Sequence, residues 1–370
     1  MSYESHAEPV RIGIVYDFKL PENYPEIKKR DFDQPLEMVF QEAYENGVID
    51  RPIEIVHKEI EGLPKGSFKA VVDAYAELVE EGCVLMYGPF ITDNSEPIRE
   101  VIEERFKIPT ISNTGSENFL GHWTFSLPQG SMTDEPVFWA HMIARRGLKT
   151  VGIVQEQSLI GEHYVTNFRK ACEDHGIQIT AHEMIAQTAQ DVRGAVERLH
   201  AARPDALVHA GFGFGVLHVN PALKELDWDP PRFMSTAFQN AWLSPALWDA
   251  IMGWTGCDNY DEGNLVGQAF LDRFEKKYGR RPEYCVSVMN HDFANVIVHA
   301  IADARPLTPA GIRDAIERIK MLPAAGGAPG TRISFGNYLH RGWCGTSYLV
   351  ARELDADKVN SHLVERFGQD

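Results

Sequence analysis

Small hydroxyl and amide side chains gather in two loops that follow apolar, strand-like runs of this sequence. The first loop spans 88–95 and contains Thr92, and the second spans 112–116 and contains Ser112, Asn113 and Thr114. Such groups donate hydrogen bonds to a carboxylate or carbonyl oxygen, and the first loop precedes a predicted helix whose N-terminus favours negative charge. The pattern indicates an acceptor-bearing ligand, with helix capping as the competing explanation for any single Ser or Thr.

Signatures of catalysis are absent. The sequence has no GxSxG, HExxH, Walker A or EF-hand pattern. Gly211–Gly215 (GFGFG) follows a predicted strand, but its spacing is not GxGxxG, so a flexible loop is favoured over a dinucleotide site. The candidates for acid–base work are Asp17, Asp93 and His291; the acids are better explained as helix caps or loop-orienting groups. We therefore expect no catalytic residue, no cofactor and no metal.

Strand-like runs alternate with amphipathic helical stretches along most of the chain, which is typical of βαβ units. The predicted strands are 10–17, 53–58, 83–87 and 109–112 in a first series, and 150–155, 178–184 and 206–210 in a second. The first predicted helix is 35–46, beginning at a proline. Two series of similar size predict two lobes, each a doubly wound sheet with its ligand crevice at the carboxyl ends of the strands.

The composition excludes several partners. The 370 residues carry a net charge of −17 with no basic block, so binding to nucleic acid or to an anionic membrane surface is disfavoured. Residues 1–9 lack the basic start and apolar core of a secretory signal, and no apolar run approaches the ~20 residues of a membrane span. As written, the chain is expected in the cytoplasm, without membrane insertion. The alternative is a periplasmic or other extracytoplasmic location, if a leader was removed.

Six segments carry a resemblance to a known family. They are RIGIVYDF (11–18), VVDAYAELVEEGCVLMYGPFITDNSEPI (71–98), KIPTISNTGSE (107–117), KTVGIVQEQSLIGEHYVTNFRKACEDHG (149–176), RPDALVHAGFGF (203–214) and YCVSVMNHDFANVI (284–297). In their order and spacing, the chain resembles the type I periplasmic binding proteins, specifically the leucine/isoleucine/valine-binding branch of ABC-transporter solute-binding proteins. The resemblance implies an α/β fold of two Rossmann-like lobes with doubly wound parallel sheets, joined by a three-stranded hinge that closes on ligand.

The same analogy assigns the lobes. It places residues 1–126 and 258–332 in lobe 1, and residues 127–257 and 333–370 in lobe 2. The chain is then expected to cross between lobes near 126–130, 253–258 and 333–341.

Matching the family's ligand contacts to this sequence preserves some groups and alters others. Thr92 matches the hydroxyl that meets the ligand carboxylate, and Ser112 and Thr114 match two contacts after the fourth strand. Ile160 stands where the family has a tyrosine. The resemblance thus implies that the carboxylate contacts are retained in lobe 1 and that one contact is altered in lobe 2.

Two further matches concern the rest of the ligand. Phe212 retains the ring of a family aromatic but lacks its hydroxyl, and Ala237 stands where the family has the acid that holds the α-ammonium. A buried ammonium without a carboxylate partner is costly, so the resemblance implies a ligand other than an α-amino acid. The remaining expected contacts, with some rings expected in the lobe cores instead, are Tyr16, Phe18, Phe90, Asn113, Phe214, Phe238 and His291, and Trp242 is a further ring near the cleft.

The expected function is therefore non-catalytic capture of a small apolar or aromatic ligand with a carboxylate or carbonyl group, in a cleft between the lobes, for an ABC-type importer. The alternative is a cytoplasmic ligand sensor of the amide-sensor type that regulates a catabolic operon. The expected partners are the small molecule and either an ABC permease or a regulatory protein.

Overall fold

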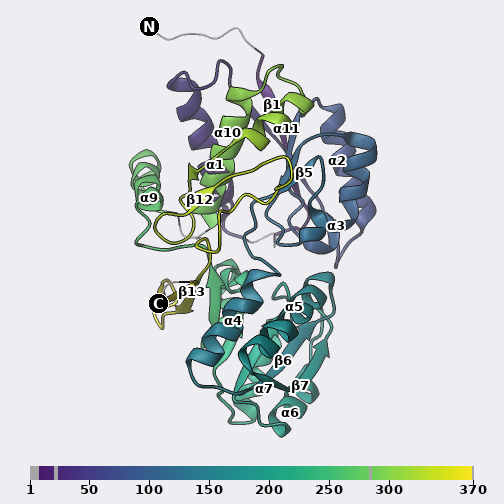
Figure 1. Ribbon diagram of the computed structural model, residues 1–370, viewed down its shortest axis with the longest axis vertical. Coiled ribbons are helices and arrows are strands. Elements are labelled where there is room, and N and C mark those ends of the chain that lie inside the picture. Colours follow the sequence, from purple (N-terminus) through teal and green to yellow (C-terminus); the bar gives the residue numbers. More distant parts are fainter. Residues whose placement is uncertain (1–7, 21–23, 283–285, 369–370) are drawn as a thin grey trace. The chain divides into compact units, whose positions relative to one another are not determined.

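A computed structural model describes residues 8–20, 24–282 and 286–368, which form two compact units (Figure 1). Unit 1 contains the described residues of 1–129 and 260–348, and unit 2 contains those of 130–259 and 349–370. The third passage between the units therefore lies at 348–349, later in the chain than expected. The segment 333–348 belongs to unit 1 because Gly342 N donates to Ser126 O (2.8 Å) and Trp343 Nε1 donates to Pro128 O (2.8 Å).

Unit 1 is built on a five-stranded sheet in the order β2-β1-β3-β4-β5, with every neighbouring pair parallel. The strands are β1 (Val10–Tyr16), β2 (Ile53–Glu59), β3 (Leu85–Tyr87), β4 (Thr110–Ser112) and β5 (Thr124–Ser126). A separate antiparallel pair joins β11 (Leu322–Pro323) to β12 (Arg332–Ile333). The pairing of β1 with β2 runs over their full length and sets Tyr16 beside Glu59 at the carboxyl end of the sheet.

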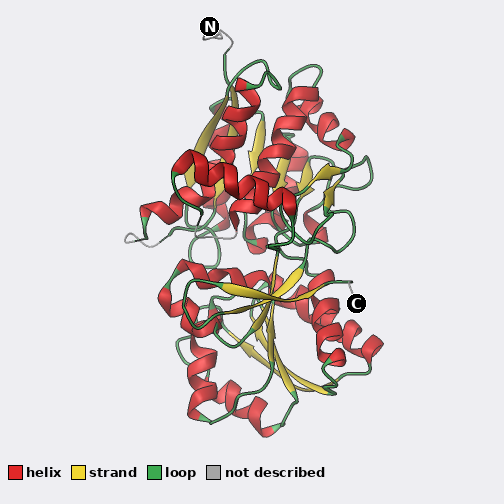
Figure 2. Cartoon of the chain, turned by 90° about the vertical axis from the view of Figure 1, so that its left-hand side faces the viewer, coloured by secondary structure: helices red, strands yellow, loops and turns green. Residues whose placement is uncertain are grey.

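Helices cover both faces of this sheet (Figures 1 and 2). They are α1 (Glu26–Glu45), α2 (Phe68–Glu80), α3 (Thr92–Val101), which continues as a π-helix (Ile102–Phe106), α9 (Leu265–Tyr278), α10 (Val286–Asp303) and α11 (Pro309–Arg318), with a 3₁₀ turn at Glu117–Phe119. Strand alternation sends Val15 and Met86 into a core with Tyr75 and Leu78 of α2. Tyr87 points the other way, and its hydroxyl donates to Asn290 Oδ1 on α10 (2.7 Å).

Helix α1 begins nine residues earlier than the sequence pattern predicted, with Pro35 inside it. A proline at this position has no N–H to donate to the carbonyl of Asp31 one turn earlier. The hydroxyl of Ser287 on α10 supplies the missing hydrogen bond to Asp31 O (2.9 Å), and Asn290 Nδ2 bonds the next carbonyl, Phe32 O (2.8 Å). A residue distant in sequence therefore replaces the hydrogen bond that the proline cannot make, and α1 begins before Pro35.

Unit 2 is built on a seven-stranded sheet in the order β14-β13-β10-β9-β8-β6-β7. The strands are β6 (Thr150–Glu156), β7 (Gln178–Ile185), β8 (Ala206–Ala210), β9 (Arg232–Met234), β10 (Thr255–Asp258), β13 (Val350–Leu354) and β14 (Ser361–Arg366). The stretch from β10 to β7 is parallel, whereas β13 and β14 pair antiparallel. The C-terminal segment thus returns to unit 2 as the edge of its sheet.

The helices of unit 2 enclose a large apolar core. They are α4 (Asp134–Arg145), α5 (Leu159–His175), α6 (Arg193–Ala201), α7 (Val219–Glu225) and α8 (Pro245–Ile251), with 3₁₀ helices at Gly215–His218 and Thr236–Leu243. Leu207, Met234, Phe238 and Trp254 lie in this core and are fully buried. Each unit is therefore a mixed α/β body around its own sheet, as the two predicted series of strands required.

Candidate functional site

Each sheet has a topological switch point, where the loops that follow two neighbouring strands run from the carboxyl ends in opposite directions. In unit 1 it lies between β1 and β3, and in unit 2 between β6 and β8. Ligands of open α/β sheets bind at such points because the diverging loops leave a crevice. In each unit, the loops after its two switch-point strands are therefore the candidate functional residues.

Asp17 organises the switch point of unit 1. Its carboxylate is fully buried and accepts hydrogen bonds from Phe90 N (2.8 Å), Ile91 N (3.1 Å) and Asn94 Nδ2 (2.7 Å). Burial raises the pKa of Asp17 to about 6, although the three hydrogen bonds act in the opposite direction. The prediction that Asp17 orients a loop is confirmed, since its oxygens hold the loop after β3.

The hydroxyls of Thr92 and Thr114 meet beside this loop, 3.1 Å apart. Thr92 is the first residue of α3, whose N-terminus has no side-chain cap. Ser112 has a different task, because its hydroxyl donates to Pro89 O (2.6 Å) and accepts from Thr114 N (3.1 Å). The arrangement leaves a threonine pair at a positive helix end, which suits a carboxylate or carbonyl oxygen.

Two other expected residues of unit 1 have partners away from this pair. Asn113 Nδ2 donates to Gln129 Oε1 (2.7 Å), in the segment that leads out of the unit. His291 lies on α10, with its ring 4.6 Å from that of Phe270 on α9 and its Nδ1 3.2 Å from Asp292. His291 therefore belongs to the packing of α9 on α10, and its contacts within the described part of the chain are with neighbours on these two helices.

The aromatic residues of unit 1 form one cluster. Tyr16 stacks on Phe90 with ring centroids 5.5 Å apart, and Phe18 meets Phe90 edge-on at 6.4 Å. Phe90 also meets Tyr87 edge-on at 4.9 Å, so the cluster joins the ends of β1 and β3. Tyr16 and Phe18 also line a separate pocket, described below.

Glu156 organises the switch point of unit 2 in the same way that Asp17 does in unit 1. Its fully buried carboxylate accepts from Phe212 N (2.9 Å), Gly213 N (3.2 Å) and Gly215 N (2.6 Å). The imidazole Nε2 of His209, also fully buried, lies 3.4 Å from Glu156 Oε1. The protein's own carboxylate accepts from these backbone N–H groups of the GFGFG loop. They are therefore not available to bind a phosphate.

The loop that Glu156 holds presents two rings. Phe212 and Phe214 are half-buried with centroids 4.9 Å apart, and Asn240 Nδ2 secures Phe212 O at 2.8 Å. Ala237 packs against the same loop, since a Cβ at Gly213 (φ +97°) would lie 3.0 Å from the Ala237 methyl. The structure therefore brings Phe212, Phe214 and Ala237 together.

Ile160 and Phe238 are more deeply buried than the two rings of this loop. Ile160 is in the first turn of α5 and is 8% exposed. Phe238 is fully buried, its ring edge-on to Trp242 at 5.7 Å, and its Cβ lies 2.2 Å from the position that a Cβ at Gly256 would take. Phe238 is thus one of the rings that pack in the core, because Gly256 makes room for it.

Unit 2 contains a second buried acid, which the sequence pattern did not predict. Glu135 on α4 accepts from Thr236 N (2.7 Å), from Ser131 N (3.1 Å) and from the hydroxyl of Tyr164. Burial raises the pKa of Glu135 to about 7. No local pattern distinguishes this acid from others in a helical first turn; the signal is its contact with residue 236, a hundred positions later.

Two features are absent from residues 8–20, 24–282 and 286–368. No group of three or more His, Cys, Asp and Glu side chains in these ranges is arranged to hold a metal ion. No helix in the same ranges is long and apolar enough to cross a membrane.

Two α/β units with loop sites at their switch points define a ligand-binding protein of the two-lobed α/β class. The family model for periplasmic binding proteins matches residues 9–345, and the chain belongs to this family. The structure is similar to a type 1 periplasmic binding protein from Bordetella pertussis Tohama I, with a TM-score of 0.80 and 19% identity over 97% of this chain and 100% of that one. The sequence has no significant match among curated proteins.

Two further solved structures show the same fold. The leucine-binding protein LivK from Thermotoga maritima has a TM-score of 0.79 and 15% identity, covering 96% of this chain and 97% of that one. An ABC-transporter solute-binding protein from R. palustris, in complex with benzoate, has a TM-score of 0.76 and 16% identity, covering 97% and 96%. The fold is therefore that of the type I periplasmic binding proteins.

Proposed function

We propose that this protein is the solute-binding component of an ABC-type importer, and that it captures a small apolar or aromatic molecule with a carboxylate or carbonyl group between its two units. The observation that carries the proposal is the pair formed by Thr92 and Thr114, 3.1 Å apart at the uncapped N-terminus of α3. Hydroxyl donors and the positive helix end both favour an anionic or carbonyl oxygen. The ligand leaves unchanged, because the site works by binding alone.

The remaining site residues favour an apolar body over an α-amino acid. Phe90, Phe212 and Phe214 supply rings, whereas Ala237 offers no charge to an ammonium group. Glu135 and Glu156 lie behind the unit 2 loops, and each accepts three hydrogen bonds from its own unit. Their carboxylates are therefore already engaged and do not offer a partner to an ammonium group. The benzoate complex of the R. palustris neighbour supports an aromatic acid as the ligand class.

A thermal-shift screen tests the ligand class. Benzoate, cyclohexanecarboxylate and related apolar acids are expected to raise the melting temperature in a concentration-dependent way, because a ligand that binds only the folded state stabilises it by mass action. Leucine and valine, whose ammonium finds no carboxylate at the threonine pair, are expected to raise the melting temperature far less than these acids. Stabilisation by leucine or valine with none by the acids would contradict the proposal.

Substitution of Thr92 tests the threonine pair. Thr92→Val keeps the shape but removes one donor to a charged oxygen, a loss of about 1.5–3 kcal/mol that weakens acid binding by at least tenfold. Isothermal titration calorimetry with the best acid of the screen measures this change. Thr166→Val, on the exposed face of α5, is the matched control and should bind like the wild type. Equal affinity of wild type and Thr92→Val would remove the observation on which the proposal stands.

A further inference from the structure

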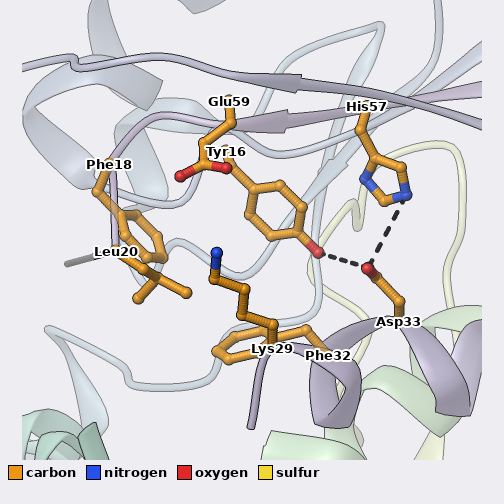
Figure 3. A pocket seen from close by; sticks show the side chains of 8 residues that line it. All are labelled: Tyr16, Phe18, Leu20, Lys29, Phe32, Asp33, His57 and Glu59. Atoms are coloured by element: carbon orange, nitrogen blue, oxygen red, sulfur yellow. Dashed lines mark hydrogen bonds and ion pairs between the residues drawn. The ribbon is translucent and has the colours of Figure 1, made fainter. Parts of the chain in front are cut away.

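Unit 1 contains a pocket that lies wholly within it, beside the carboxyl ends of β1 and β2 (Figure 3). Its volume is about 160 Å³, and its apolar walls are Tyr16, Phe18, Leu20 and Phe32. Tyr16 meets Phe18 and Phe32 edge-on, with ring centroids 6.4 and 6.3 Å apart. A cavity of this size accommodates one benzene ring, so the pocket fits a single aromatic side chain.

The walls are fixed before any ligand arrives. The Tyr16 hydroxyl donates to Asp33 Oδ1 at 2.9 Å, and the imidazole of His57 stacks on the Tyr16 ring with centroids 5.8 Å apart and planes 6° from parallel. His57 Nε2 also lies 3.9 Å from Asp33 Oδ1. Asp33 and His57 therefore hold the tyrosine in place, and a rigid aromatic wall lowers the entropic cost of binding.

Two opposite charges enter the same pocket from different elements. Lys29 extends from the first turns of α1, and Glu59 projects from the last position of β2, next to Tyr16 in the sheet (Figure 3). Among the residues that the structure describes, neither the Lys29 ammonium nor the Glu59 carboxylate has a hydrogen-bond or ion-pair partner. The pocket thus offers one cation and one anion to a ligand, with aromatic rings around them.

We propose that this pocket is a second ligand site, and that it binds the zwitterion of an aromatic α-amino acid. Lys29 takes the carboxylate, Glu59 takes the ammonium, and the ring enters between Phe18, Tyr16 and Phe32. A ligand with a single charge satisfies one of the two groups and faces repulsion from the other. The site is independent of the proposed function, whose threonine pair and unit 2 loops it does not use.

Three ligands with the same ring test the proposal. L-phenylalanine carries both charges, 3-phenylpropanoate only the carboxylate, and 2-phenylethylamine only the ammonium. At the site that is sensitive to substitution of Lys29 and Glu59, calorimetric titration is expected to show phenylalanine binding at least tenfold more tightly than either, since each lost charge-assisted contact contributes about 1.4 kcal/mol or more. Equal or tighter binding of either single-charge ligand, at a site sensitive to Lys29 and Glu59, would overturn the proposal.

Substitutions then locate the site. Lys29→Gln and Glu59→Gln are each expected to weaken phenylalanine binding at least tenfold, by the same estimate. The matched controls are Lys69→Gln, also in the first turn of a helix, and Glu54→Gln, on the same strand as Glu59; both should bind like the wild type. Because all four side chains lie at least partly in solvent, the variants should fold.

The outcomes separate this site from the proposed function. Loss of phenylalanine binding in Lys29→Gln and Glu59→Gln, with benzoate binding unchanged, supports the second site. Phenylalanine binding that survives both substitutions but disappears in Thr92→Val overturns it and places the amino acid at the threonine pair. No phenylalanine binding at millimolar concentration also overturns it, while the response to apolar acids still decides the proposed function.

Discussion

Replacing Glu156 by alanine is expected to lower the free energy of unfolding by about 3–5 kcal/mol, the range for removing one partner of a buried charged network. The carboxylate accepts from the N–H groups of Phe212, Gly213 and Gly215, and it is fully buried. Alanine leaves these donors without an acceptor in a place that water reaches poorly, and the cost of each orphaned group is about 1–3 kcal/mol.

One effect opposes this loss. Removing a buried charge relieves its desolvation penalty, and an apolar replacement of a whole ion pair is sometimes stabilising. Here the partners are backbone groups that no substitution removes, so the unpaired donors dominate. Glu156→Gln should fall between alanine and wild type, because its amide oxygen serves one side of the loop while its NH₂ faces donors on the other.

Urea unfolding followed by tryptophan fluorescence measures the change. The control is Glu162→Ala, on the exposed face of α5, which makes none of these contacts and should alter stability by less than about 0.5 kcal/mol. A loss below about 1 kcal/mol for Glu156→Ala would mean that the loop finds other acceptors, and that Glu156 does not organise the switch point.

Periodicity was sufficient for the elements that bury a regular face. The strand predicted at 206–210 has the bounds of β8, and the one predicted at 150–155 is one residue shorter than β6. It failed for β9, which has three residues, and for β13, whose buried Arg352 interrupts the apolar pattern. Arg352 lies in the sheet because Ser361 on β14 accepts from it (2.9 Å), a contact that the sequence does not reveal.

The candidate site also contains residues that a local sequence pattern identifies and residues that it does not. Thr92 and Thr114 were predictable because each belongs to a hydroxyl-rich loop directly after a predicted strand. Glu156 was not, since a carboxylate at a strand end looks like any solvated acid until the fold returns the loop of 211–215 to it. Buried acids of this kind are defined by partners distant in the chain, and only the three-dimensional fold identifies them.

Glu135 is expected to give unit 2 a stability that decreases as the pH rises. Burial raises its pKa to about 7 in the folded protein, whereas an unfolded glutamate titrates near about 4.3. Between these two values the folded carboxyl holds a proton that the unfolded chain has released, so the free energy of unfolding falls with increasing pH. The contribution is fully present below the unfolded pKa and is lost as the pH passes through the folded one.

The hydrogen bonds of Glu135 are compatible with that proton. Its partners include two backbone N–H groups, of Ser131 and Thr236, and the hydroxyl of Tyr164. A hydroxyl donates or accepts as required, so Tyr164 can accept from the protonated carboxyl while Thr236 N retains its acceptor. Glu135→Gln imitates this neutral form, and any donor–donor contact of its amide with Ser131 N shifts stability equally at every pH.

The measurement is therefore a difference between two proteins. The free energy of unfolding of wild type minus that of Glu135→Gln should fall by about 2–3 kcal/mol between pH 5 and pH 8, at about 1.4 kcal/mol per unit below the folded pKa. Asp17, whose pKa burial also raises, to about 6, titrates in both proteins and cancels. Glu162→Gln should show no such trend against wild type. A difference that stays constant or grows with pH would mean that Glu135 is already ionised at pH 5, with its three donors outweighing the cost of burial.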